Sequence, residues 1–203
     1  MTRTPLIPTL AALLLAGSAF AGAHAQMAKT QMEPMTMADP ATTVMVGGQA
    51  MYPSRTIVAN AVNSADHTTL VAAVKAAGLV DALGGKGPLT VFAPTNEAFT
   101  DLPAGTVETL LKPENKDMLV KILENHVVAG DYGSTDLRAA IIAGHGKAVL
   151  KTLAGTTLIV TMNGTSNFLV HDGKGGVADI AITDVNQSNG VIHVVDKVLL
   201  PAG

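Results

Sequence analysis

Apolar residues recur at helical spacing from Pro53 onward, and they alternate with polar residues in the last third of the chain. Two amphipathic helices are expected first: one on Ile57 to Val62, and one that begins at Asp66 as N-cap and ends before Gly78. A glycine-rich break then precedes a short buried strand at 89–92. The first part of the pattern therefore predicts a helical layer that leads into a strand.

The middle of the chain continues the helical pattern. A short helix is expected at 107–111. A second begins at Pro113 and carries an apolar stripe on Met118, Leu119, Ile122 and Leu123. A third runs from a Ser134 cap to Ile142. The segment from His126 to Ala129 lies between the last two of these helices and is typical of an extended strand.

Strand patterns dominate after residue 147. Five strands are expected, at 148–153, 156–162, 167–171, 177–185 and 191–199. Asn163-Gly164 and Asn189-Gly190 are strong hairpin signals, because such turns need positive φ. Helices first and antiparallel strands later indicate a single α+β domain.

The N-terminus has the features of an export signal. Arg3 precedes a mostly apolar run from Leu10 to Phe20, and Ala23-His24-Ala25 fits the small-x-small pattern of a cleavage site. We interpret residues 1–25 as a signal peptide, so the mature chain is expected to begin at Gln26. The run is short for a membrane span, which predicts a secreted or periplasmic protein with no membrane span after signal removal. We also expect the protein to be a monomer.

Residues 26–52 contain scattered methionines without a helical or alternating period. We expect a flexible lead there, with the folded domain at 53–203. Thioethers suit Cu(I), and Met32, Met35 and Met37 are close enough in an extended chain to converge on one ion. The alternative function is therefore a periplasmic metal (copper) or stress-handling protein that uses this lead.

The composition excludes several classes of chemistry. The chain has no cysteine, which removes thiol catalysis, thiolate metal sites and disulfides. A formal charge of −3 gives no basic footprint for nucleic acid. The glycine-rich segments lack the P-loop lysine-serine/threonine pattern, and no GxSxG elbow is present. Nothing positive in the sequence therefore supports an enzyme, and we expect no cofactor.

His126 and His193 each lie inside an apolar run. A neutral imidazole buried there needs a hydrogen-bond partner, so both are first interpreted as structural histidines. A small-ligand or hydrolytic role in a cleft near His193 stays open as an alternative.

Two long segments are specific enough to identify a family. "TVFAPTNEAF", residues 90–99, reads physically as a strand, a Thr95 cap and a helix start, and it resembles the first signature of the fasciclin (FAS1) family. "NGVIHVVDKVLLP", residues 189–201, resembles the second signature, and "LVKILENHVVAGDY" and "LKTLAGTTLIVTMNG" resemble the segments between them. The resemblance covers about residues 53–201.

The resemblance implies a β-wedge of mostly antiparallel strands with helices packed around it. It also implies a non-catalytic module for adhesion or protein interaction, with an unknown cell-surface or matrix protein as partner. The family's adhesive regions correspond here to His126, Asp196 and Lys197, although Asn125 stands where the family has a tyrosine.

Overall fold

The structure is a computed structural model that describes residues 43–202. Its strands and helices are β1 (Val44–Val46), β2 (Gln49–Met51), α1 (Ile57–Ala61), the 3-10 turn η2 (Ala65–His67), α2 (Thr68–Ala77), α3 (Val80–Gly84), β3 (Leu89–Pro94), α4 (Asn96–Thr100), α5 (Thr106–Leu110), the 3-10 turn η3 (Pro113–Asn115), α6 (Lys116–Asn125), β4 (Val127–Ala129), α7 (Ser134–Ala143), β5 (Lys147–Lys151), β6 (Thr157–Asn163), β7 (Asn167–His171), β8 (Val177–Gln187) and β9 (Gly190–Val195).

A seven-stranded sheet organises the domain, in the order β4-β3-β9-β8-β7-β6-β5. Every neighbouring pair in it is antiparallel except β3 and β9, which run parallel with Phe92 opposite His193. The sheet curls, because the chain just after β5 returns to β4, where the Leu153 N–H donates to the Val127 carbonyl at 2.8 Å. The predicted α+β wedge of mostly antiparallel strands is therefore confirmed.

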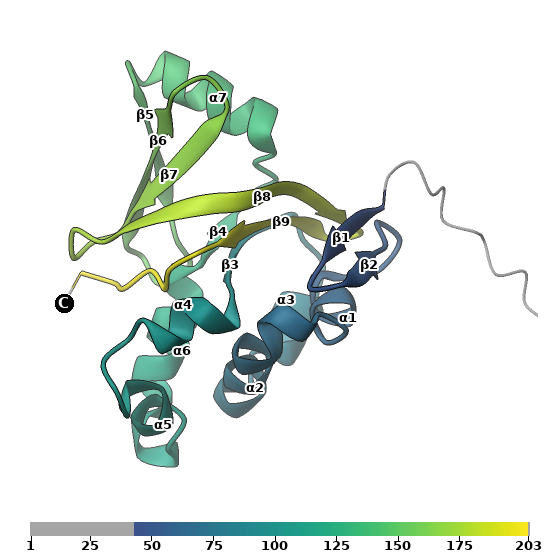
Figure 1. Cartoon of the computed structure of the whole chain (residues 1–203), viewed down its shortest axis with the longest axis vertical. Helices are drawn as coiled ribbons and strands as arrows, with labels where there is room; N and C mark the ends of the chain where they lie inside the picture. The colour runs from purple at the N-terminus through teal and green to yellow at the C-terminus, as the bar shows by residue number, and fades with distance from the viewer. Residues whose placement is uncertain (1–42, 203) are drawn as a thin grey trace, which may run out of the picture. The chain divides into compact units, whose positions relative to one another are not determined.

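Two hydrophobic clusters fill the domain. One packs α1 to α6 against β3 and β9, and the other packs α7 against β5 to β8. Figure 1 shows this division: α7 lies against the β5–β6–β7 part of the sheet, whereas the other helices gather around β3. Strand β9 is buried along its whole length, because the sheet is covered on both sides at its centre.

Local chemistry explains where the first helices and strands begin and end. The Thr95 hydroxyl accepts a hydrogen bond from the Ala98 N–H and starts α4, as the sequence predicts. Gly78 ends α2 in the left-handed conformation, also as predicted. Asp66 does not cap α2, since it lies inside η2. The short helix α3 was not predicted, because it ends at Gly84, in the glycine-rich segment that was interpreted as a break in the chain.

Two other details of the sequence prediction are wrong. Met118 is 58% exposed, so the buried stripe of α6 consists of Leu119, Ile122 and Leu123. Ser134 is the first residue of α7 rather than its cap. The cap is supplied by β8 instead: the Asp184 carboxylate accepts hydrogen bonds from both the N–H and the hydroxyl of Ser134.

The expected flexible lead at 26–52 extends too far toward the domain. Residues 44–51 form the hairpin β1–β2, in which Val46 and Met51 are each 3% exposed and belong to the first cluster. Gly47 and Gly48 both have positive φ and make the turn. The predicted signal peptide and the rest of the lead, including Met32, Met35 and Met37, lie outside the described residues.

Candidate functional site

The backbone of Leu199 is held by two consecutive side chains, Asn125 and His126. The Asn125 amide donates to the Leu199 carbonyl at 3.0 Å, and the Leu199 N–H donates to His126 Nε2 at 2.8 Å. Asn125 also accepts a hydrogen bond from the Thr156 hydroxyl. We name this arrangement the Leu199 clamp. It replaces strand pairing just after β9 ends, so it fixes the segment that follows the sheet.

His126 is 2% exposed, and both of its ring nitrogens are used. Its Nδ1 donates to the Ile122 carbonyl at 2.8 Å, which leaves Nε2 as the acceptor for Leu199. Burial lowers the pKa of His126 to about 4. The predicted structural role is confirmed, whereas direct contact between this ring and a partner is not compatible with its burial.

His193 is also buried, with no exposed surface. Its Nε2 donates to the Tyr132 carbonyl at 2.8 Å, and its ring stacks on Phe92 with centroids 5.7 Å apart. Burial lowers the pKa of His193, although the Tyr132 carbonyl and nearby carboxylates act in the opposite direction. Because the ring has no exposed surface, a ligand cannot contact it in this structure, and the alternative of a ligand site at His193 loses its geometric basis.

Asp196 and Lys197 are exposed, between β9 and the Leu199 clamp. The Asp196 carboxylate accepts a hydrogen bond from the Asp179 N–H at 2.7 Å, and the Asp196 N–H donates to the Asp179 carbonyl. These two bonds attach the predicted contact residues to the edge of β8. The clamp and β8 together hold them in place.

The outward side of strands β5 to β8 is not covered by α7, which packs on the opposite side. We call this surface the open sheet face. Cross-strand pairing places its residues in two rows, since paired residues share a face: Val149, Ile159, His171 and Val177 in one, and Lys147, Thr161, Leu169 and Asp179 in the other.

The open sheet face combines exposed aliphatic side chains with polar and charged ones. Val149 is 60% exposed and Val177 is 39% exposed, while Ile159 and Leu169 are half-buried. The Thr161 hydroxyl and His171 Nε2 lie 2.9 Å apart within it. Asp196 and Lys197 border it through Asp179, which accepts a hydrogen bond from Asn167. Sequence alternation indicated which residues share a side, but only the position of α7 shows which side is open.

The part of the chain that the structure describes contains neither a metal-ligand cluster nor a helix that could span a membrane. Within residues 43–202, no three His, Asp or Glu side chains converge closely enough to hold a metal ion. The described helices are also all too short or too polar to cross a bilayer. The copper alternative therefore depends on the methionines outside the described residues.

Comparison with known proteins gives consistent matches. The family model for the fasciclin domain matches residues 65–201. Protein sll1483 of Synechocystis sp. is 47% identical over 175 residues, which cover 84% of this chain and 88% of that protein. Immunogenic protein MPB70 of Mycobacterium bovis is 34% identical over 169 residues, which cover 81% of this chain and 77% of that protein. Human periostin is 32% identical over 136 residues, which cover 67% of this chain and 15% of periostin.

A solved structure shares the fold. It is a FAS1 domain pair from the insect cell adhesion molecule fasciclin I, with a TM-score of 0.65 and 19% sequence identity. The match covers 73% of this chain and 52% of that one.

Proposed function

This chain belongs to the fasciclin domain family, and from that premise we propose that it is an exported, non-catalytic protein that mediates adhesion or protein interaction at a cell surface. The open sheet face is the observation that carries the proposal. Family membership supports the general role, and the fold neighbour is itself described as a cell adhesion molecule.

The composition of the open sheet face suits a protein partner. Val149 and Val177, exposed aliphatic side chains at the two ends of one row, can be desolvated at little polar cost. Lys147 and Lys151 lie on the outer side of β5, and Asp196 and Lys197 lie across the face. Exposed aliphatic side chains beside charged ones are compatible with a protein interface.

The predicted contact residues divide into two roles. We propose that Asp196 and Lys197 touch the partner directly, because they are exposed beside the open sheet face. His126 supports them from inside the domain, since it holds Leu199 two residues after Lys197. The partner is expected to be a protein of a cell surface or matrix.

The test uses beads coated with the mature protein and living cells from its natural surroundings. Val149→Asp replaces a 60% exposed aliphatic side chain with a charge and should reduce bead retention about tenfold, as expected for the loss of one apolar contact that the partner buries. Lys197→Glu should reduce it less, since rim charges contribute less.

The matched control is Ile142→Asp, which makes the same kind of change at a 70% exposed aliphatic residue of α7, on the other side of the sheet. It should retain wild-type adhesion. Equal retention by Val149→Asp and the wild type would show that the open sheet face is not the contact surface. No retention by the wild-type protein on any cell would remove the adhesive role itself.

A further inference from the structure

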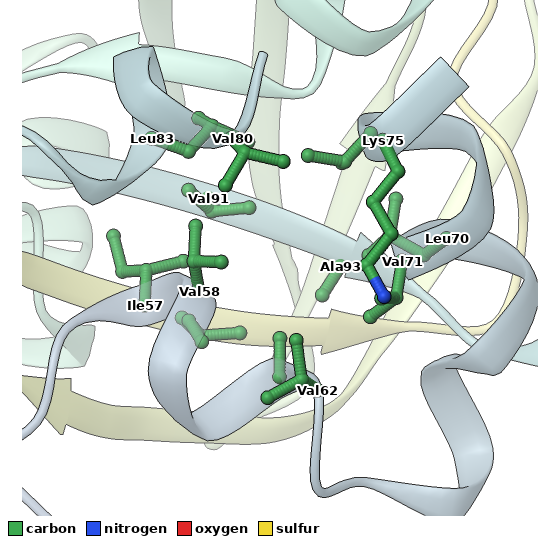
Figure 2. A pocket seen from close by; sticks show the side chains of 13 residues that line it. Ile57, Val58, Val62, Leu70, Val71, Lys75, Val80, Leu83, Val91 and Ala93 are labelled. Carbon is green, nitrogen blue, oxygen red and sulfur yellow. The ribbon is translucent and has the colours of Figure 1, made fainter. Parts of the chain in front are cut away.

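A second surface feature is an apolar cleft enclosed by α1, α2 and α3. Val91 and Ala93 of β3 and Ile192 of β9 form its floor. Figure 2 shows aliphatic side chains from the three helices converging over this floor. The central sheet is thus reachable here between the helices.

The lining of the cleft contains only apolar atoms on its accessible surface. Several of its side chains stay partly exposed, and Val62 at the end of α1 is 47% exposed. The opening follows from the sequence, since α1 has only five residues and places the small Ala61 beside the cleft. Water gains few hydrogen bonds in such a place, so an apolar ligand would displace it favourably.

The dimensions of the cleft restrict the shape of a ligand. The enclosed part of the cleft has a volume of only about 40 Å³, and the rest is open to solvent, so a bound ligand would stay partly exposed. Because the cleft is narrow, it suits one unbranched chain better than a fused ring system.

Lys75 is the only charged residue among those that line the cleft, and only its methylene groups belong to the accessible lining. It lies in the last turn of α2, and Figure 2 shows its ammonium nitrogen as the only non-carbon atom among the side chains drawn. The methylene groups of Lys75 can cover apolar ligand surface while the ammonium stays hydrated at the opening. A ligand with an apolar body and an anionic head matches this arrangement of charge.

We propose that the cleft between α1, α2 and α3 binds the alkyl chain of a long-chain carboxylate, with Lys75 pairing with the carboxylate at the opening. This activity is separate from adhesion through the open sheet face, so either can fail without the other.

The first experiment titrates octanoate, decanoate and laurate into the mature full chain by isothermal calorimetry. Binding should saturate at one ligand per chain, and affinity should rise about fourfold for each added methylene until the cleft is filled. The heat capacity change should be negative, as apolar burial requires. Absence of saturable laurate binding, or an affinity independent of chain length, would overturn the proposal.

Variants locate the site. Ala61→Phe fills the cleft and should abolish laurate binding, whereas Ala72→Phe adds the same ring on the exposed side of α2 and should bind normally. A thermal melt checks that each variant folds. If Ala61→Phe does not fold, Val58→Phe at the side of the cleft replaces it. A folded cleft-filling variant that still binds laurate would rule out this site.

The head group is tested separately. Lys75→Gln should weaken laurate about twofold to fivefold, the range of an exposed ion pair, and should leave dodecanol unchanged. Lys121→Gln, at an exposed lysine of α6, is the control. Equal affinity for laurate and dodecylammonium would refute the pairing with Lys75. Binding that appears only in a chain starting at Thr43 would mean that the protein's own N-terminal part, not a carboxylate, occupies the cleft.

Discussion

Acid should destabilise this domain, and His126 allows the effect to be estimated. The ring is buried and neutral, and its Nε2 accepts the Leu199 N–H. Protonation would place a second donor against that N–H and would leave a charge in an apolar interior. The Leu199 clamp therefore requires the neutral ring.

The magnitude follows from the shift in pKa. Burial lowers the pKa of His126 from 6.5 to about 4, and the unfolded chain has the ordinary value. Above pH 6.5 neither state binds the proton, so the contribution of the neutral ring is complete. As the pH falls from 6.5 toward 4, only the unfolded state binds the proton, and about 3 kcal/mol of stability is lost. That is a large share of the 5–15 kcal/mol typical of a domain.

Two other buried histidines act in the same direction. Burial lowers the pKa of both His67 and His193, so each adds to the loss of stability below pH 6.5. The slope of the unfolding free energy against pH is therefore expected to exceed the slope that a single titrating histidine would give. A variant that changes only His126 isolates its part.

The assay is urea unfolding at closely spaced pH values between 4.5 and 7.5. His126→Gln can donate to Ile122 and accept from Leu199 without titrating, so its stability should fall less steeply with acid, by up to about 1.4 kcal/mol per pH unit. His145→Asn removes an exposed imidazole and should keep the wild-type slope. Identical slopes for His126→Gln and the wild type, or a flat wild-type profile, would refute this reasoning.

Three further predictions concern single residues and the N-terminal methionines. Asn125→Ala leaves the Leu199 carbonyl and the Thr156 hydroxyl without their partner, and should cost about 1–3 kcal/mol in denaturant melts, whereas Asn163→Ala at an exposed turn should cost far less. Gly190→Ala should prevent folding, as judged by circular dichroism, because its Cβ would collide with the Leu89 carbonyl in the adjacent strand; Gly164→Ala, which meets open space at a positive φ, should only weaken the fold. If Met32, Met35 and Met37 bind copper, Cu(I) should bind the mature chain more tightly than a chain starting at Thr43, and equal, weak binding by both would remove the copper alternative.

The sequence predicted those parts of the fold that depend on local chemistry. Strand β7 has the predicted bounds, because its alternation and flanking turns are strong. The hairpin β1–β2 was missed even though Gly47-Gly48 lies between alternating residues, since the methionines were interpreted as a lead. Met118 was wrongly placed in the core, because the apolar stripe of α6 is wider than the surface that α6 buries.

The functional surfaces were harder to predict because they depend on contacts distant in sequence. A buried hydrogen-bonded His126 could be expected from its apolar neighbours, but its acceptor role for Leu199 joins residues 73 positions apart. The cleft beside Lys75 likewise combines three short helices with two strands that are adjacent only in the folded sheet. No local pattern in the sequence indicates that these distant segments pack together.

The position of the two signature segments explains why the family could be recognised while the partner could not. "TVFAPTNEAF" contains all of β3 except Leu89, and "NGVIHVVDKVLLP" contains β9. These strands are parallel neighbours in the sheet. Both are buried almost throughout, so packing restricts nearly every side chain in them. The open sheet face is built on β5 to β8 instead, where every second residue points to solvent and packing restricts it little. Resemblance in the signatures therefore identifies the fold, whereas the proposed partner contacts lie on outward-facing residues such as Val149 and Leu169.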